Sequence, residues 1–197
     1  AYLAFEALPQ ALKGSQSYQV VYKPVLFAAL LKHHGQLGPA EIAGKREWTY
    51  RQVLWQAKQH NVALDMPSAH PFNPLSLLRL SVACDVQGTP NRYVCETIFR
   101  HIWQGGAVAD DAQRLQQLTQ QLQPQRSADS AEVKAQLKSN TDEAIARGVF
   151  GVPTFCVDDK LFWGLDALPM LRAYLDADRW FDTHWSAAAS VTQGVRR

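Results

Sequence analysis

A chain of 197 residues with 47% hydrophobic and 19% charged side chains can bury a core in one or two globular domains. Its formal net charge of +2 gives no reason to expect nucleic acid or a membrane as a partner, and no apolar run is long enough to span a bilayer. The three cysteines, Cys84, Cys95 and Cys156, form no C-x-x-C pair and no metal-site spacing. We therefore expect reduced thiols, a cytoplasmic location and no bound metal.

The first 147 residues predict one helix, one strand and a long helical block. Apolar residues recur at helical spacing over residues 1–12, where Pro9 predicts a kink. Residues 19–27 are almost continuously apolar and β-branched, which is typical of a buried parallel strand. The remaining apolar and capping patterns predict only helices, at residues 28–34, 41–60, 74–85, 89–103, 110–122 and 130–147.

Residues 148–175 predict a helix end, a hairpin and a last helix. Thr154–Val157 has the β-branched and aromatic composition of a strand, and Asp158-Asp159 is an acceptable turn pair. Residues 161–163 then pair back as the second strand. Gly164 ends this strand before an apolar periodic run.

Val152 and Pro153 open the first strand of this hairpin. A proline cannot donate to a strand ladder, so the simplest interpretation is an ordinary proline at a strand start. If the bond is cis, the N–H and C=O of Val152 face outward without partners, and such an edge can pair with an extended peptide.

Two motifs give the chain a family resemblance. The stretch G-V-F-G-V-P-T-F, followed by F-W-G-L-D, and the segment H-P-F-N-P-L at residues 70–75 resemble bacterial 2-hydroxychromene-2-carboxylate isomerases. These are relatives of kappa-class glutathione transferases within the DsbA-like branch of the thioredoxin fold. The order of predicted elements agrees with that family over nearly the whole chain.

The resemblance implies an α/β fold, in which a thioredoxin-like, DsbA-type sheet carries a large all-helical insertion. Residues 1–27 and 148–185 would form a discontinuous thioredoxin-like domain, residues 28–147 the insertion, and residues 186–197 a frayed tail. Family members begin with a further apolar strand, central in the sheet and ending in Ser-Pro. The start of this chain, A-Y-L, matches the residues that come after this Ser-Pro in the family. We therefore expect the strand, with the serine that bonds the glutathione sulfur, directly before Ala1, and we assign no catalytic nucleophile.

The same resemblance implies glutathione as the cofactor. We expect six residues to hold it: Lys45, Val152, Pro153, Gly164, Leu165 and Asp166. In the family, the G-x-D after the hairpin receives the γ-glutamyl end of glutathione. The aspartate carboxylate pairs with the ammonium group of the ligand, and N–H groups of the first helical turn bind the carboxylate of the ligand. We expect Asp166 to be the N-cap of the last helix whether or not it binds glutathione, and the alternative for Lys45 is a solvated helix face. The match departs from the family where Trp48 replaces a tyrosine and Ala167 an arginine.

Other side chains have two interpretations each. Asn73 either faces an aromatic substrate, as the resemblance implies, or caps the helix that begins at Pro74. We expect His70 to be a surface loop histidine rather than a base, and Cys156 to be buried and inert. We expect three aromatic side chains to belong to the hydrophobic core: Phe150, Phe162 and Trp163. The alternative is that they line a cleft for a flat aromatic ligand.

The implied function is glutathione-dependent cis–trans isomerisation of a 2-hydroxychromene-2-carboxylate-like aromatic pyruvate compound. The partner would be a small aromatic or electrophilic substrate, and homodimer formation stays open. The alternatives are glutathione conjugation, as in kappa-class transferases, thiol–disulfide exchange, as in DsbA, and an inactive glutathione- or peptide-binding relic. Oxidoreductase chemistry is disfavoured because the chain has no C-x-x-C.

Overall fold

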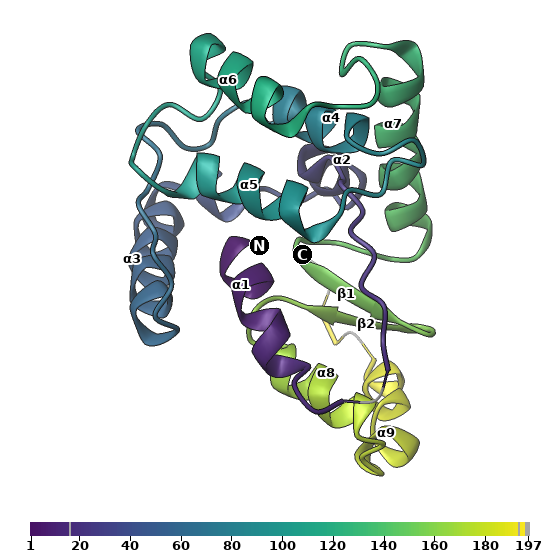
Figure 1. The fold of residues 1–197 in the computed structure, drawn as a ribbon. Coiled ribbons are helices and arrows are strands. Elements are labelled where there is room, and N and C mark those ends of the chain that lie inside the picture. The colour runs from purple at the N-terminus through teal and green to yellow at the C-terminus, as the bar shows by residue number, and fades with distance from the viewer. Residues whose placement is uncertain (16, 193, 196–197) are drawn as a thin grey trace.

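The computed structural model describes residues 1–15, 17–192 and 194–195. A helical block and a smaller unit built on one β-hairpin make up the fold (Figure 1). In chain order the elements are α1 (Tyr2–Ala11), α2 (Phe27–His33), η1 (Pro39–Glu41), α3 (Ala43–Gln59), α4 (Leu75–Ala83), α5 (Arg92–Trp103), α6 (Ala112–Leu122), α7 (Ala131–Ala146), β1 (Thr154–Val157), β2 (Lys160–Trp163), α8 (Leu168–Leu175), α9 (Trp180–Thr183) and η2 (Ser186–Ser190).

The hairpin has the expected position and register. Strands β1 and β2 pair antiparallel, with Thr154 opposite Trp163 and Phe155 opposite Phe162. Asp158 takes a left-handed conformation at the turn, with φ of 52°, which aspartate tolerates better than most residues. Because side chains alternate along a strand, Phe162 points into the protein while Trp163 points away from it.

The core of the hairpin unit lies between the sheet, α1 and α8. Phe162, at 1% exposure, packs with Leu8 and Leu12 at the end of α1 and with Leu168 and Leu171 of α8. Helices α1 and α8 lie side by side next to the hairpin (Figure 1). A two-stranded hairpin is at best marginally stable alone, so this apolar packing is what stabilises it.

The helical block has cores of its own. Helices α4, α5 and α6 enclose one cluster, which includes Leu77, Ile98 and Leu118. Helix α7 packs on α4 through a second cluster around Val82 and Val133. Asn91 caps α5 by accepting a hydrogen bond from the N–H of Val94, which explains where this predicted helix begins.

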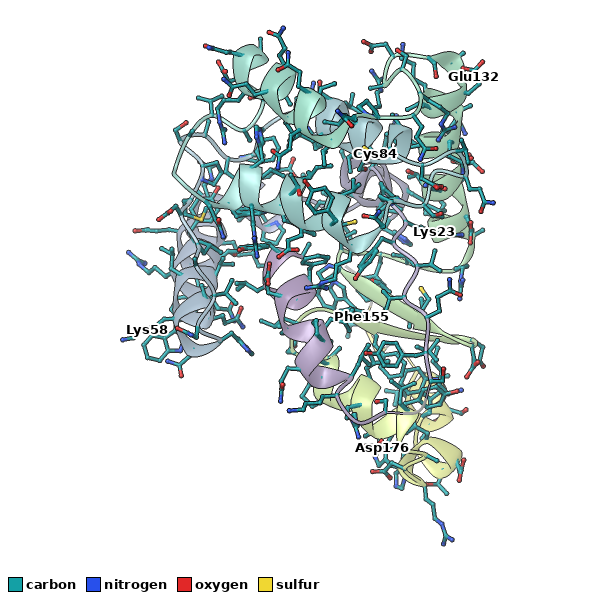
Figure 2. All side chains as sticks on the ribbon, viewed as in Figure 1. Lys23, Lys58, Cys84, Glu132, Phe155 and Asp176 are labelled. Atoms are coloured by element: carbon teal, nitrogen blue, oxygen red, sulfur yellow. The ribbon has the colours of Figure 1, made fainter. Side chains whose placement is uncertain are left out.

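The predicted strand at residues 19–27 is wrong. Residues 19–26 form no strand, Phe27 begins α2, and within the described residues the only sheet is the two-stranded β1–β2 hairpin. Several of its polar contacts go to α7: Asn140 Nδ2 donates to the Pro24 carbonyl oxygen at 3.3 Å, and Lys23, which Figure 2 labels, pairs with Glu143 at 2.6 Å. An apolar and β-branched run indicates an extended chain, but a strand also needs a neighbouring strand for its backbone.

The division into residues 1–27 with 148–185 and residues 28–147 stays a prediction. Helix α1 joins the two parts, because Tyr2 and Leu3 pack with Ala57 of α3. Of the expected frayed tail, residues 186–190 form the exposed turn η2, and residues 193, 196 and 197 lie outside the described residues. No helix among the described residues is both long and apolar enough to cross a membrane.

Replacing Phe162 with alanine should lower the free energy of unfolding by about 3–5 kcal/mol, because it removes a fully buried ring and leaves a cavity. Urea denaturation followed by circular dichroism measures this loss. Trp55→Ala is the matched control, since this ring is 58% exposed on α3 and its loss should cost much less. Equal losses for the two variants would show that Phe162 does not hold the hairpin core.

Candidate functional site

Two parts of the hairpin motif meet at the end of the hairpin opposite its turn. The Val152–Pro153 peptide bond is cis. The N–H of Gly164 donates to the carbonyl oxygen of Pro153 at 3.0 Å, which holds the chain after β2 against the chain before β1. Within the described residues, neither the N–H nor the C=O of Val152 forms a hydrogen bond. This peptide group can therefore pair with an extended ligand.

Gly164 and Asp166 fit together closely. Gly164 has φ of 95°, and a Cβ atom built on it would lie 2.5 Å from Oδ1 of Asp166. The glycine therefore permits the carboxylate to lie next to the backbone. Asp166 is exposed, and its side chain forms no hydrogen bond or ion pair with the described part of the chain.

The N-cap interpretation of Asp166 is wrong. The N-cap of α8 is Ala167, without a side-chain hydrogen bond, and the Leu168 N–H donates to the Leu165 carbonyl oxygen at 3.2 Å. The carboxylate lies next to Gly164, and the helix begins two residues after Asp166. Among the described residues the backbone N–H groups of Asp166 and Ala167 have no acceptor, so an anion could bind there next to the positive end of α8.

Leu165 connects this end of the hairpin to the rest of the protein. Its side chain packs against the cluster that contains Phe162 and also against the cluster of Tyr2, Leu3 and Ala57. Five of the predicted site residues, Val152, Pro153, Gly164, Leu165 and Asp166, thus lie together, near the start of α1 and the packed face of α3.

Lys45 and Asn73 are not joined to that cluster by any hydrogen bond among the described residues. Lys45 is exposed near the start of α3 and has no ion pair within the described ranges. Asn73 Oδ1 accepts a hydrogen bond from the N–H of Leu75 at 3.1 Å, but the N-cap of α4 is Pro74, so Asn73 is not the cap residue that the sequence suggested. Its Nδ2 group forms no hydrogen bond in the part of the chain that the structure describes, so it remains a donor for a ligand.

No sequence pattern predicted the polar contact between Tyr50 and His70. The hydroxyl oxygen of Tyr50 lies 2.8 Å from the carbonyl oxygen and 2.9 Å from Nδ1 of His70. The Tyr50 hydroxyl donates to the carbonyl oxygen, and the donor and acceptor roles at Nδ1 depend on the imidazole tautomer. His70 is half-buried against Trp103, not a surface histidine, and this burial lowers its pKa.

Cys156 is exposed, contrary to the prediction that it is buried. The reason is strand alternation: Phe155 and Val157 face the core, so the side chain between them faces the other way. Partial burial of the sulfur raises the pKa of the Cys156 thiol, which keeps the thiolate fraction small at neutral pH.

A polar groove of about 440 Å³ opens between α5 and α6, away from the hairpin. Its cations are already engaged: Arg100 pairs with Glu96, and Arg114 donates to the carbonyl oxygens of Val108 and His101. The end of the hairpin, by contrast, combines free backbone groups with a free carboxylate. It is therefore the better candidate site.

Comparison with known proteins fits this arrangement. Residues 1–176 match the family model described as the DSBA-like thioredoxin domain. The chain belongs to the DSBA-like thioredoxin family. Among solved structures it is similar to a 2-hydroxychromene-2-carboxylate isomerase, with a TM-score of 0.75, 20% identity, and coverage of 96% of this chain and 93% of that one. The predicted thioredoxin-like fold with its helical part is thereby confirmed.

Relatives in the family include isomerases and glutathione transferases. "Glutathione s-transferase kappa 2" of Caenorhabditis elegans is 24% identical over 197 aligned residues, covering 89% of this chain and 86% of its own. The 2-hydroxychromene-2-carboxylate isomerase of Pseudomonas putida is 27% identical over 181 residues, which cover 88% of this chain and 87% of the isomerase. The isomerase of Sphingobium xenophagum is 54% identical over 33 residues, 17% of each chain. The predicted resemblance to both groups is confirmed.

His70 should make stability depend on pH. Its folded-state pKa lies below the ordinary value of 6.5, so the unfolded chain binds more protons as pH falls. The stability that comes from burying neutral His70 is therefore present above about pH 6.5 and is lost as pH falls through the lowered pKa. Urea unfolding at several pH values between about 7.5 and 5 should give a shallower pH dependence for His70→Gln. His60→Gln, at an exposed histidine, should match the wild type; identical slopes for all three proteins would contradict the burial of His70.

Cys156 should be accessible and yet dispensable. A maleimide reagent should label it slowly at about pH 7 and faster at about pH 9, because the raised pKa limits the thiolate. Mass spectrometry after digestion measures labelling at each cysteine, and Cys156→Ala should retain activity. Loss of turnover in this variant, with unchanged melting, would show that the thiol has a catalytic role.

Proposed function

We propose that this protein is a glutathione-dependent cis–trans isomerase of an aromatic pyruvate compound similar to 2-hydroxychromene-2-carboxylate. The observation that carries the proposal is the Gly164–Pro153 hydrogen bond, which brings a free peptide group and a free carboxylate together. The similarity to the Pseudomonas putida isomerase over 88% of the chain supports the choice of reaction.

The residues present fit the two ends of a γ-glutamyl peptide. The Asp166 carboxylate would pair with the ligand ammonium, and the free N–H groups of Asp166 and Ala167 would bind its α-carboxylate. The Val152 N–H and C=O would pair with the ligand backbone beside Pro153. Lys45 is proposed for the other end of the peptide, as an exposed cation near the start of α3.

Glutathione, when bound, would supply a thiolate for reversible addition to a conjugated double bond, which would permit rotation about that bond. The chain's own part is to orient the substrate beside Val152 and to stabilise charge on the substrate carbonyl. Asn73 Nδ2 is proposed as a donor for that carbonyl, because its Oδ1 is fixed by the N–H of Leu75.

Asp166→Ala should weaken glutathione binding by about 1–3 kcal/mol, since a charge-assisted hydrogen bond is lost. Isothermal titration calorimetry on the full chain measures this. Asp182→Ala removes the same charge from an exposed position on α9 and should leave the affinity unchanged. If both variants bind glutathione as the wild type does, Asp166 is not an anchor.

Turnover distinguishes the isomerase from its alternatives. With a cis aromatic enone and glutathione, an isomerase forms the trans compound while the free thiol concentration stays constant. A transferase of the kappa type, supported by the C. elegans relative, consumes one thiol per substrate. Binding of glutathione with neither change would leave the protein as a binding relic. Chromatography of the two isomers together with a thiol assay separates these outcomes.

A further inference from the structure

Two aromatic side chains are exposed next to the free Val152 peptide. Phe150 is 38% exposed and Trp163 is 53% exposed, whereas Phe162, the residue before Trp163, is 1% exposed. The Phe150 and Trp163 rings lie 5.0 Å apart between centroids at an interplanar angle of 61°, so they form a corner with two ring faces. Exposed aromatic rings leave apolar surface in contact with water, and a ligand that covers this surface gains binding free energy.

The backbone fixes the position of the Trp163 ring. A Cβ atom on Gly151 would lie 2.4 Å from Nε1 and 3.0 Å from Cε2 of Trp163, so the indole lies directly on the Gly151 backbone. Gly151 is buried, and its carbonyl oxygen accepts a hydrogen bond from Thr154 Oγ1 at 2.7 Å. The indole is thus held by a backbone that is itself fixed, and a ligand would not have to order this side chain on binding.

The corner is continuous with the proposed cofactor site. Gly151 and Phe150 directly precede Val152, and Trp163 directly precedes Gly164, whose N–H bonds to Pro153. A planar ring can stack on one aromatic face and meet the other edge-on, an arrangement that an aliphatic chain cannot reproduce.

We propose that Phe150 and Trp163 bind the aromatic ring of the substrate and select planar aromatic compounds over aliphatic ones. The inference rests on the proposed function, since it names the side chains that recognise the aromatic ring at that same site. Gly151 is the positioning residue, because any side chain there would displace the indole.

Two probes test the selection. Trans-cinnamate is a planar aromatic enoate, and sorbate is an aliphatic dienoate with the same carboxylate. Calorimetry with the full chain and saturating glutathione should show tighter binding of cinnamate by the wild type. Trp163→Leu should weaken cinnamate about tenfold, as expected for losing an aromatic contact, and should change sorbate less than about twofold.

Three further variants make the test specific. Gly151→Ala should reproduce the loss by displacing the indole, and Trp163→Phe should retain part of the cinnamate preference. Trp55→Leu removes a similarly exposed indole on α3, 58% exposed, and should change neither probe. Should Gly151→Ala fail to fold, the two Trp163 variants still decide the outcome.

Equal weakening of both probes in Trp163→Leu, no weakening of cinnamate, or no cinnamate binding by the wild type would overturn the inference. Glutathione affinity is measured separately in each variant and should stay within about twofold of the wild type. If the wild type binds no glutathione, the proposed function fails, whereas a lost cinnamate preference with intact glutathione binding rejects only the aromatic corner.

Discussion

Burial of Phe162 is the interaction on which the rest of the arrangement depends. Two four-residue strands do not hold together in water unless one face is covered. Phe162 supplies that cover by packing on Leu8 of α1 and on Leu168 and Leu171 of α8. Once its side chain faces inward, the register of the hairpin is set, because a slip by one residue would turn the apolar side chains outward.

The same alternation decides what the opposite face of the sheet presents. Trp163 and Cys156 must face outward because Phe162, Phe155 and Val157 face the core. One buried ring therefore creates an exposed indole and an exposed thiol. The thiol stays weakly nucleophilic because its pKa is raised, whereas the indole is held on Gly151 next to the free Val152 peptide.

The candidate site is defined by backbone groups more than by side chains. Its determinants are the free Val152 peptide, the free N–H groups before α8 and one carboxylate, held together by the Gly164–Pro153 hydrogen bond. Backbone groups have fixed directions and need no rotamer ordering, which suits recognition of a peptide ligand. Glycine at 151 and 164 keeps the space beside them open for the Trp163 ring and the Asp166 carboxylate.

Local patterns determined the hairpin, its turn, most helices and the family, because turn chemistry, capping and apolar periodicity act over a few residues. They also placed Val152, Pro153, Gly164, Leu165 and Asp166 in one site, since these residues flank a single hairpin. Only the tertiary structure decided the rest. Residues 19–27 contact α7 rather than a strand, Cys156 faces outward, Asp166 lies over Gly164 instead of capping α8, and Tyr50 bonds His70 across 20 positions. The contacts of residues 19–27 and of Tyr50 depend on which distant segment lies nearby, and a local sequence pattern carries no information about that neighbour. The positions of Cys156 and Asp166 depend on the strand alternation and on the residue at which α8 begins.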